Sequence, residues 1–487
     1  MKQILCILLS VLGWTTGMTQ NPYQIKGKVD CENKGIHGVV VSDGKNCVQT
    51  DEQGNYSLDI DNESQFVFIS TPAGYLTEVK ENTIPLFYEP IDRSSDKKYD
   101  FHLKKNPHDD LNHVFFAQAD VQAISSENLD TYHTFQNDYL EQLAAYPNTD
   151  IFGIDCGDIT GDNAQLFPPY IEAVKTLNIP IYRAIGNHDM DYTGRSFETS
   201  HHSFESYFGP TCYSFNKGKM HYIVINNNFY IGREFYYIGY IDEKTFQWIE
   251  KDLSFLEKGS PLVIVMHIPT RLTEKQQPFQ FDYNTLADQT VNAEAFHQLI
   301  QDHPTHIISG HMHYNLNICY NDRLMEHNTA AICGTWWCSD ICLDGTPRGY
   351  GIYQVNGNQL TWKYKCIGKP DNYQARVYLP GASQEYPQAI IANVWNWDEQ
   401  WKVEWMEDGK VMGEMTQFTA FDPLAEKICN KAVQTYSWIA PVKTNHLFKA
   451  IPKNPQAQIS VKITDRFGHE YLQPAEDFSS TLLQLNN

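Results

Sequence analysis

Basic residues are scarce in this chain. Its 487 residues include 37 Lys and Arg against 59 Asp and Glu, which gives a formal net charge of −22 at pH 7. Nucleic acids and anionic membrane surfaces are bound mainly through positive charge. We therefore expect no nucleic-acid-binding surface. A phosphorylated partner would need local neutralisation, which metal ions can supply.

Long hydrophobic runs are also rare. The only one begins at Ile4 and ends at Trp14, after a basic start and before small polar residues. It is too short for a stable membrane anchor and is typical of a signal peptide, which we place at residues 1–19. Cys6 lies inside the run and not after it, so we expect no lipid anchor. We predict export to the periplasm or beyond the cell and no later membrane span; a buried N-terminal strand is the alternative.

The sequence shows no internal repeat, no low-complexity segment and no paired C-x-x-C motif of a zinc ribbon. A hydrophobic content of 42% argues against disorder. Export permits disulfides. Cys31 and Cys47 flank a short β-like stretch and could pair. The pairing of the other cysteines and the oligomeric state stay open.

Short alternating runs separated by Gly, Asp and Asn turns fill residues 22–104, which predicts a small β-sandwich. Strand-like and helical runs then alternate over 108–354, including an amphipathic helix at 246–256. Residues 355–487 return to a β-rich pattern. There we expect a hairpin between 389–395 and 401–405, and a strand and turn at 459–468.

Polar clusters follow apolar strand-like runs at five places in the middle segment. A strand that ends in a polar loop places ligands at the carboxyl edge of a sheet, where α/β folds build their sites. Carboxylate, amide and imidazole groups together suit Mn, Fe or Zn. In chain order the clusters are Asp120-Val121-Gln122, Gly157-Asp158-Ile159-Thr160-Gly161-Asp162, Gly186-Asn187-His188-Asp189, His267, and Gly310-His311-Met312-His313.

This ordered set resembles the calcineurin-like metallophosphoesterase superfamily over roughly residues 110–350. The family motifs read D-x-H, G-D-x-x-[DG], G-N-H-[DE], an isolated His and G-H-x-H. The chain departs from the family pattern at Gln122, where the family usually has His. Some branches of the family also have Gln at this position. The three-part order resembles a secreted bacterial branch with an N-terminal transthyretin-like domain and a C-terminal β domain. The resemblance implies an α/β (α+β) core, a four-layer α/β/β/α sandwich, between two small β domains.

The resemblance also implies the ligands of two divalent or trivalent metal ions. One ion would take Asp120, Gln122, Asp158 and His313; the other would take Asp158, Asn187, His267 and His311. Asp158 would bridge both ions. A hydroxide between the ions would attack phosphorus, Asn187 would orient the phosphate, and His188 would protonate the leaving oxygen as general acid.

Residues outside the motifs give weaker indications. Arg195 follows the third motif, where a loop could cover the site, and it could contact phosphate. Trp336 and Trp337 lie in an aromatic segment that could line a substrate pocket, although packing of that loop against the core explains them equally well. Asp162 or Asp189 could orient neighbouring site residues.

The sequence thus predicts a secreted, metal-dependent phosphoric-ester hydrolase, a phosphatase or a phosphodiesterase. The alternatives are a phosphodiesterase on lipid or nucleotide substrates, and a degenerate enzyme that serves as a surface or carbohydrate-binding protein. The near-complete ligand set argues against the degenerate protein.

Overall fold

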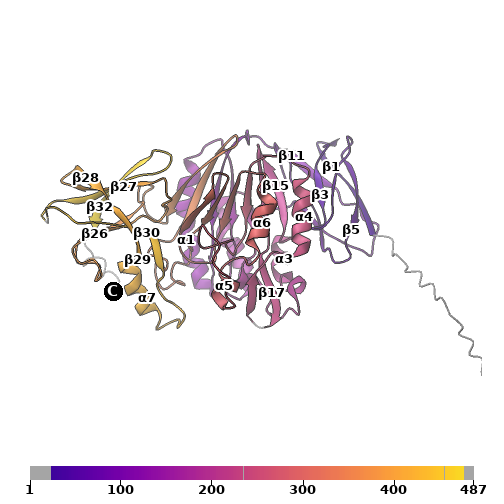
Figure 1. Cartoon of the computed structure of the whole chain (residues 1–487). Coiled ribbons are helices and arrows are strands. Elements are labelled where there is room, and N and C mark those ends of the chain that lie inside the picture. The colour runs from indigo at the N-terminus through magenta and orange to yellow at the C-terminus, as the bar shows by residue number, and fades with distance from the viewer. Residues whose placement is uncertain (1–22, 234, 455, 477–487) are drawn as a thin grey trace, which may run out of the picture.

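Three regions lie in a row in the computed structural model, which describes residues 23–233, 235–454 and 456–476 (Figure 1). The predicted signal peptide at 1–19 lies outside these residues. Within them, none of the helices combines the length and the apolar character that crossing a membrane requires.

The N-terminal region consists of strands in two main sheets, with orders β2-β1-β11-β7 (β5 also pairs with β1) and β10-β6-β3-β4. Its hairpins use the turn residues that the sequence indicated, and Gly54 takes a positive φ of 80° between β4 and β5. The strands are β1 (Tyr23–Cys31), β2 (Lys34–Gly35), β3 (Val40–Ser42), β4 (Cys47–Gln49), β5 (Asn55–Ile60), β6 (Phe66–Ile69), β7 (Tyr75–Leu76), β8 (Val79–Lys80), β9 (Ile84–Pro85), β10 (Tyr88–Pro90) and β11 (Phe101–Lys105).

The central region is an α/β core with two sheets. One has the order β14-β13-β12-β23-β24 and the other β15-β16-β19-β20-β22-β21. The strands are β12 (Asn112–Gln118), β13 (Asp150–Asp155), β14 (Ile181–Arg183), β15 (Tyr213–Lys217), β16 (Met220–Val224), β17 (Asn228–Arg233), β18 (Tyr236–Gly239), β19 (Leu262–Val265), β20 (Thr305–Ser309), β21 (Leu316–Asn321), β22 (Leu324–Asn328), β23 (Gly349–Asn356) and β24 (Gln359–Cys366). The helices are α1 (Ser126–Ala144), α2 (Phe167–Val174), α3 (His202–Phe208), α4 (Glu243–Leu253), α5 (Tyr283–Ala287) and α6 (Ala293–Ile300).

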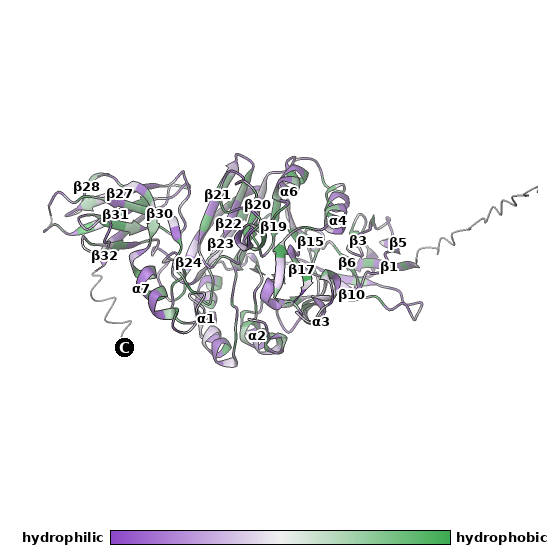
Figure 2. Ribbon diagram, turned by 60° about the horizontal axis from the view of Figure 1, so that its bottom comes forward, coloured by the Kyte–Doolittle hydropathy of each residue, from purple (hydrophilic) through white to green (hydrophobic). Residues whose placement is uncertain are grey.

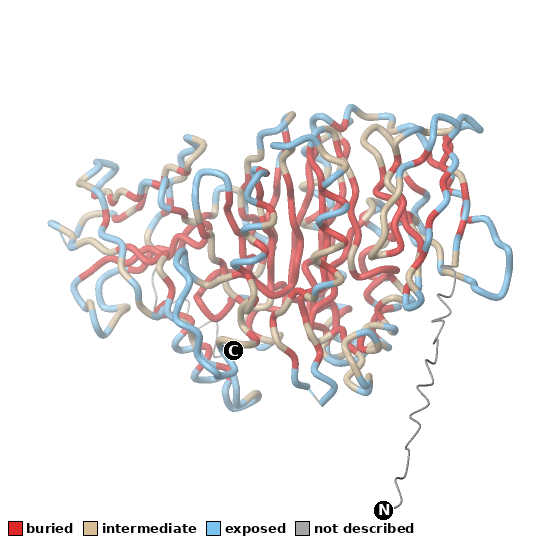
Figure 3. The backbone as a smooth tube through the Cα atoms, turned by 45° about the vertical axis from the view of Figure 1, so that its right-hand side comes forward, coloured by how far each residue is buried: buried red, intermediate tan, exposed pale blue. Residues whose placement is uncertain are grey.

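Alternation along β12 explains how the two sheets and the helices pack. Phe115 faces the second sheet and meets the ring of Tyr222 at 5.7 Å, whereas Phe116 faces the other way and meets Tyr139 of α1 at 6.4 Å. Trp248 of α4 and Phe296 of α6 join the same apolar cluster as Tyr222. The core strands are buried along much of their length (Figure 3), and hydrophobic residues line β19 and β20 (Figure 2).

The α/β core with β-rich regions on both sides confirms the coarse fold expectation. The contacts just described support a four-layer α/β/β/α order, which stays a prediction. Two details were wrong. The core does not end at 354, because β24 pairs with β23 along residues 359–366. The expected hairpin does not form, because β26 pairs with β25 and β30 while β27 pairs with β28 and β31.

The C-terminal region is a sheet of order β28-β27-β31-β32-β25-β26-β30-β29 with one flanking helix among its described residues. Its strands are β25 (Arg376–Tyr378), β26 (Ile390–Asn393), β27 (Lys402–Glu407), β28 (Lys410–Glu414), β29 (Thr416–Phe421), β30 (Lys443–Ala450), β31 (Ile459–Thr464) and β32 (Glu470–Glu476), with helix α7 (Pro423–Ala432). The cysteines of the described residues are free, so the pairing of Cys31 with Cys47 is not found.

Candidate metal centre

Five strands end at one edge of the core and lead directly into the five motifs. Strands β12, β13 and β14 run parallel in the first sheet, and β19 runs parallel to β20 in the second. The backbone N–H of His311, just after β20, donates to the carboxylate of Asp120, just after β12, at 3.0 and 3.1 Å. The two sheets therefore present their polar loops to each other at their carboxyl ends.

The motif glycines allow this close approach. A Cβ built on Gly186 would lie 2.1 Å from the backbone nitrogen of Asp158, and one on Gly310 would lie 2.5 Å from the Cβ of Ala119. Neither position has room for a side chain. The G-N-H and G-H-x-H motifs thus need glycine for packing of loop against loop.

Most of the predicted ligands have a left-handed backbone. This conformation costs about 1–3 kcal/mol for a residue other than glycine and is found mainly where the surrounding structure imposes it, often at functional sites. Here the loops impose it on one another; the N–H of Gln122, for example, donates to the carbonyl of Asp158 at 2.6 Å. The φ angles are 55° for Asp120, 39° for Gln122, 52° for Asp158, 74° for His311 and 54° for His313.

One group of ligands, which we call the tight half, is Asp158, Asn187, His267 and His311. The Nδ1 of His267 lies 2.8 Å from the carbonyl of Cys156, which can only accept, so this nitrogen carries the hydrogen. In the neutral ring, the Nε2 of His267 therefore carries the lone pair that a metal ion could bind. It lies 3.0 Å from Oδ1 of Asn187, 3.2 Å from Oδ2 of Asp158 and 3.2 Å from Nδ1 of His311.

These donor atoms fit a cation. One ligand atom each from Asp158, His267 and His311 lies within 4.8 Å of the others, and the side chains are buried or half-buried. The lone pairs of these buried oxygen and nitrogen atoms converge on one point, where they repel one another unless a cation lies between them. Burial lowers the pKa of His267, but Asp158 and Asp120 outweigh it and raise that pKa to about 9. A metal ion would compete with this proton for the same lone pair.

The other predicted ligands are Asp120, Gln122 and His313, which we call the open half. Their donor atoms lie farther apart than those of the tight half. The Nε2 of His313 lies 3.6 Å from Oδ1 of Asp120. The Oε1 of Gln122 accepts from the thiol of Cys333 at 3.8 Å, and the same sulfur lies 3.6 Å from Nδ1 of His313. Burial, together with the charge of Asp158, raises the pKa of Asp120 to about 8 despite the opposing charge of His267.

His188 lies beside both halves and is half-buried. Its backbone N–H donates to Oδ1 of Asp158 at 2.8 Å, and its ring Nδ1 lies 2.8 Å from Oδ1 of Asp162. Burial lowers the pKa of this imidazole, but Asp158 and Asp162 outweigh burial and raise it to about 9. The Nδ1–H of the ring is directed to Asp162, which leaves Nε2 free of this contact.

Asp189 holds the second and third motifs together. Its buried carboxylate accepts from the backbone N–H groups of Ile159 at 3.1 Å, Thr160 at 2.9 Å and Gly186 at 3.0 Å. Three N–H donors around one carboxylate fix the loops on which Asp158 and Asn187 lie. Asp189 supports the ligand loops through these backbone contacts.

The three predicted substrate contacts lie in different places. Trp336 stacks on the ring of His313, with centroids 4.2 Å apart and 20° between planes. The indole N–H of Trp337 donates to the carbonyl of Val121 at 3.1 Å and so braces the first motif. Arg195 is exposed and lines a cavity with residues of the N-terminal region such as Asp43 and Lys45; no predicted metal ligand is among the described residues that line it. A phosphate contact of Arg195 stays a prediction.

The C-terminal region supports the fifth motif. The backbone N–H of Asn315, two residues beyond His313, donates to the buried carboxylate of Asp344 at 3.0 Å. That carboxylate lies 3.0 Å from Nε2 of His446 in β30. The side chain of Asn315 donates to the carbonyl of Trp395 at 3.1 Å. The loop that carries His313 is therefore tied to the neighbouring β region.

Three side chains that border the site are not among the predicted site residues. Cys333 lies between Gln122 and His313, yet it is far from both along the chain. The hydroxyl of Tyr192 donates to the carbonyl of Asn187 at 2.6 Å, and the ring of Tyr237 meets His311 edge-on at 6.0 Å. Only Tyr192, which closely follows the third motif, had a sequence signal that could have found it.

Three family models match consecutive parts of the chain. The model for the N terminal of calcineurin-like phosphoesterase matches residues 23–106, that for calcineurin-like phosphoesterase matches 84–315, and that for the C terminal of calcineurin-like phosphoesterase matches 326–471. The search of curated proteins found no match.

Solved structures show a distant similarity. A dimetal phosphatase from Danio rerio is 13% identical with a TM-score of 0.39, over 53% of this chain and 97% of that chain. A purple acid phosphatase from yellow lupin (Lupinus luteus) seeds is 12% identical with a TM-score of 0.39, over 69% of this chain and 68% of that chain.

Proposed function

This chain belongs to the calcineurin-like phosphoesterases with their N-terminal and C-terminal domain families, and we propose that it is a metal-dependent phosphoric-ester hydrolase with a dinuclear metal centre. The observation that carries the proposal is the convergence of Asp158, His267 and His311 on one point at the carboxyl edge of the core. The four-layer order of that core is part of the same proposal.

We assign the tight half and the open half to one ion each, with Asp158 shared because a carboxylate can face two cations with its two oxygens. Bound Mn, Fe or Zn ions would neutralise the phosphate and supply hydroxide at neutral pH. The protein's own task is to hold the ligands in place. Backbone contacts of Asp158, His311 and Asp189 hold these loops.

His188 is the proposed general acid. Its Nδ1–H is directed to Asp162, which leaves Nε2 to carry the proton that a leaving oxygen needs. As the bond between phosphorus and the leaving oxygen breaks, that oxygen takes the proton and the ring becomes neutral. We assign to Asn187 the task of orienting the phosphate; its side chain lies 3.0 Å from His267 and its backbone precedes His188, which supports a position beside the metal centre.

Paired substrates test the function. The purified protein is reconstituted with Mn, Fe or Zn and given p-nitrophenyl phosphate and bis-p-nitrophenyl phosphate. Turnover of the first indicates a monoesterase and turnover of the second a diesterase. Protein that binds no metal and turns over neither would contradict the proposal and favour a binding protein with a degenerate core.

Export is a separate proposal that rests on the N-terminal sequence pattern. We expect the mature chain outside the cytoplasm, with its phosphorylated substrate there. Cell fractionation with N-terminal sequencing of the mature protein tests this, and an uncleaved chain in the cytoplasm would contradict it.

A further inference from the structure

Aromatic side chains gather beside the tight half. We define the aromatic wall as Tyr192, Phe235, Tyr237 and Tyr283, which come from the loop after the third motif, the β17–β18 hairpin and α5. The ring centroids of Tyr192 and Phe235 are 4.6 Å apart. The hydroxyl of Tyr283 donates to the hydroxyl of Tyr237 at 3.2 Å. Three segments of the core thus contribute to one aromatic surface.

The wall contacts the predicted ligands directly. Tyr192 donates to the carbonyl of Asn187 at 2.6 Å, and Tyr237 meets the ring of His311 at 6.0 Å. The inner members, Tyr192 and Tyr237, are half-buried and buried, whereas Phe235 is 62% exposed and Tyr283 is 54% exposed. The aromatic surface therefore runs from the metal ligands outward into solvent.

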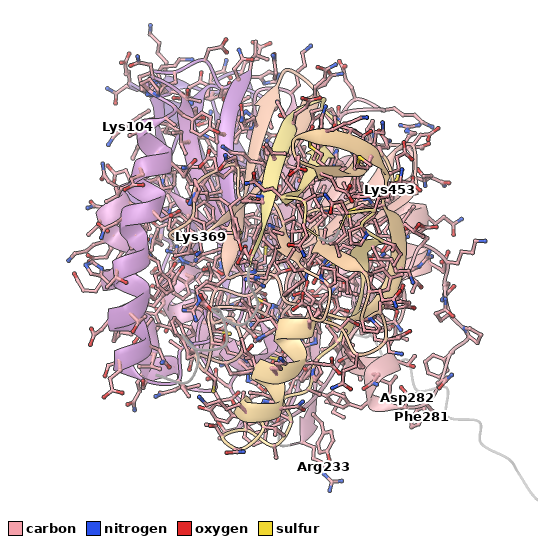
Figure 4. All side chains as sticks on the ribbon, turned by 90° about the vertical axis from the view of Figure 1, so that its left-hand side faces the viewer. Lys104, Arg233, Phe281, Asp282, Lys369 and Lys453 are labelled. Atoms are coloured by element: carbon pink, nitrogen blue, oxygen red, sulfur yellow. The ribbon has the colours of Figure 1, made fainter. Side chains whose placement is uncertain are left out.

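Two further exposed aromatic residues lie in the same segments of the chain. Phe281, just before α5, is 88% exposed, and Tyr236 in β18 is 49% exposed. Phe281 and Asp282 project from the lower end of the molecule, as does Arg233 at the end of β17 (Figure 4). Single exposed apolar residues are normal, so the inference rests on the four residues of the wall, which contact one another and the predicted ligands.

We propose that the aromatic wall binds the organic part of the substrate, and that this part is a flat aromatic ring close to the phosphate. This inference rests on the proposed function of the metal centre. Ring faces and edges favour another ring in stacked or edge-on contact, and such contacts add to simple burial of apolar area. The four side chains of the wall carry no charge, and the net charge of −22 opposes an anionic lipid surface.

Phosphonates test the wall without the complication of a leaving group. Methylphosphonate, hexylphosphonate and phenylphosphonate are compared as inhibitors, and their binding to the metal-loaded protein is measured by calorimetry. We expect phenylphosphonate to bind about tenfold more tightly than methylphosphonate. If hexylphosphonate bound most tightly of the three, the wall would favour an alkyl chain, and the proposal of a flat aromatic ring would be wrong.

Two variants locate the effect. Phe235→Ala should weaken phenylphosphonate about threefold to tenfold and leave methylphosphonate unchanged. Trp438→Ala is the matched control, because Trp438 is also 62% exposed but lies in the C-terminal region. It should change neither constant.

The outcomes separate the wall from the function. If phosphate esters are hydrolysed but the three phosphonates bind alike and Phe235→Ala has no effect, the wall does not bind substrate and the proposed function stands. If no ester is hydrolysed and no phosphonate binds, both proposals fail together.

Discussion

The two halves of the candidate metal centre differ in how closely the fold has assembled them. In the tight half, three donor atoms lie within 3.2 Å of Nε2 of His267, and the carbonyl of Cys156 fixes the tautomer of that ring. In the open half, the shortest approach between His313 and Asp120 is 3.6 Å, and Gln122 contacts a thiol.

The ligand chemistry of the two halves differs as well. An imidazole nitrogen is a stronger ligand than a neutral amide oxygen for borderline metals, and Gln122 supplies the amide. Backbone contacts from other motifs hold both halves; the N–H of His311 donates to Asp120, and the N–H of Gln122 donates to the carbonyl of Asp158. We therefore expect two ions of unequal affinity.

Replacing Asp158, the ligand that both ions would share, should have the largest effect. Asp158→Asn removes the only charged bridge, so both ions should be lost and turnover should fall to background. Elemental analysis together with p-nitrophenyl phosphate assays measures this. Asp130→Asn, an exposed carboxylate in α1, is the control and should behave as the natural protein. A variant Asp158→Asn that kept both ions would remove Asp158 from its bridging role.

His188→Ala should separate chemistry from metal binding. Both halves keep their ligands, so the metal content should be unchanged while turnover of an alkyl phosphate falls by about 10²–10⁴-fold. The loss should be smaller with p-nitrophenyl phosphate, because p-nitrophenolate leaves with little need of a proton. Loss of metal from this variant would show that His188 is a ligand or a support of one.

Changes at Gln122 should affect the open half alone. Gln122→Ala should lower the affinity for the ion of the open half by about tenfold, and Gln122→His should raise it if the ring fits the space. The affinity for the ion of the tight half should stay the same. Calorimetric titration of metal-free protein measures both affinities. An unchanged second affinity in both variants would mean that Gln122 does not contact metal.

A change at His446, which lies in the C-terminal region, should have a small effect on the ion affinities of the two halves. His446→Ala removes the partner of Asp344, which supports the loop of His313, so the ion of the open half should weaken a few-fold and the ion of the tight half should weaken less. Rescue by His446→Gln, whose amide nitrogen can take the place of Nε2 beside Asp344, would argue for hydrogen bonding. Equal weakening of both ions would indicate a general loss of folding stability instead.

Local sequence signals were enough to find the strands that position the motifs. Apolar runs such as Leu262–Val265 form strands, and the polar residues that follow them meet at one edge of the core. The helix predicted at 246–256 is α4, from Glu243 to Leu253. These features depend on residues close together in the chain, which is why a pattern in the sequence reveals them.

Features that depend on distant pairing were not predictable. The C-terminal strands choose partners far along the chain, so the pairing of β26 with β30 replaced the expected hairpin. The contact of Cys333 with Gln122 joins residues that no spacing rule connects. The aromatic wall likewise brings Tyr192 and Phe235 together from separate loops.

Metal titration of the metal-free protein tests the unequal halves most directly. Calorimetry with elemental analysis should give two classes of site per chain; the tighter class should survive Gln122→Ala and vanish in His267→Ala. Two equal sites, or loss of the tighter site in Gln122→Ala but not in His267→Ala, would contradict the assignment of the tight half.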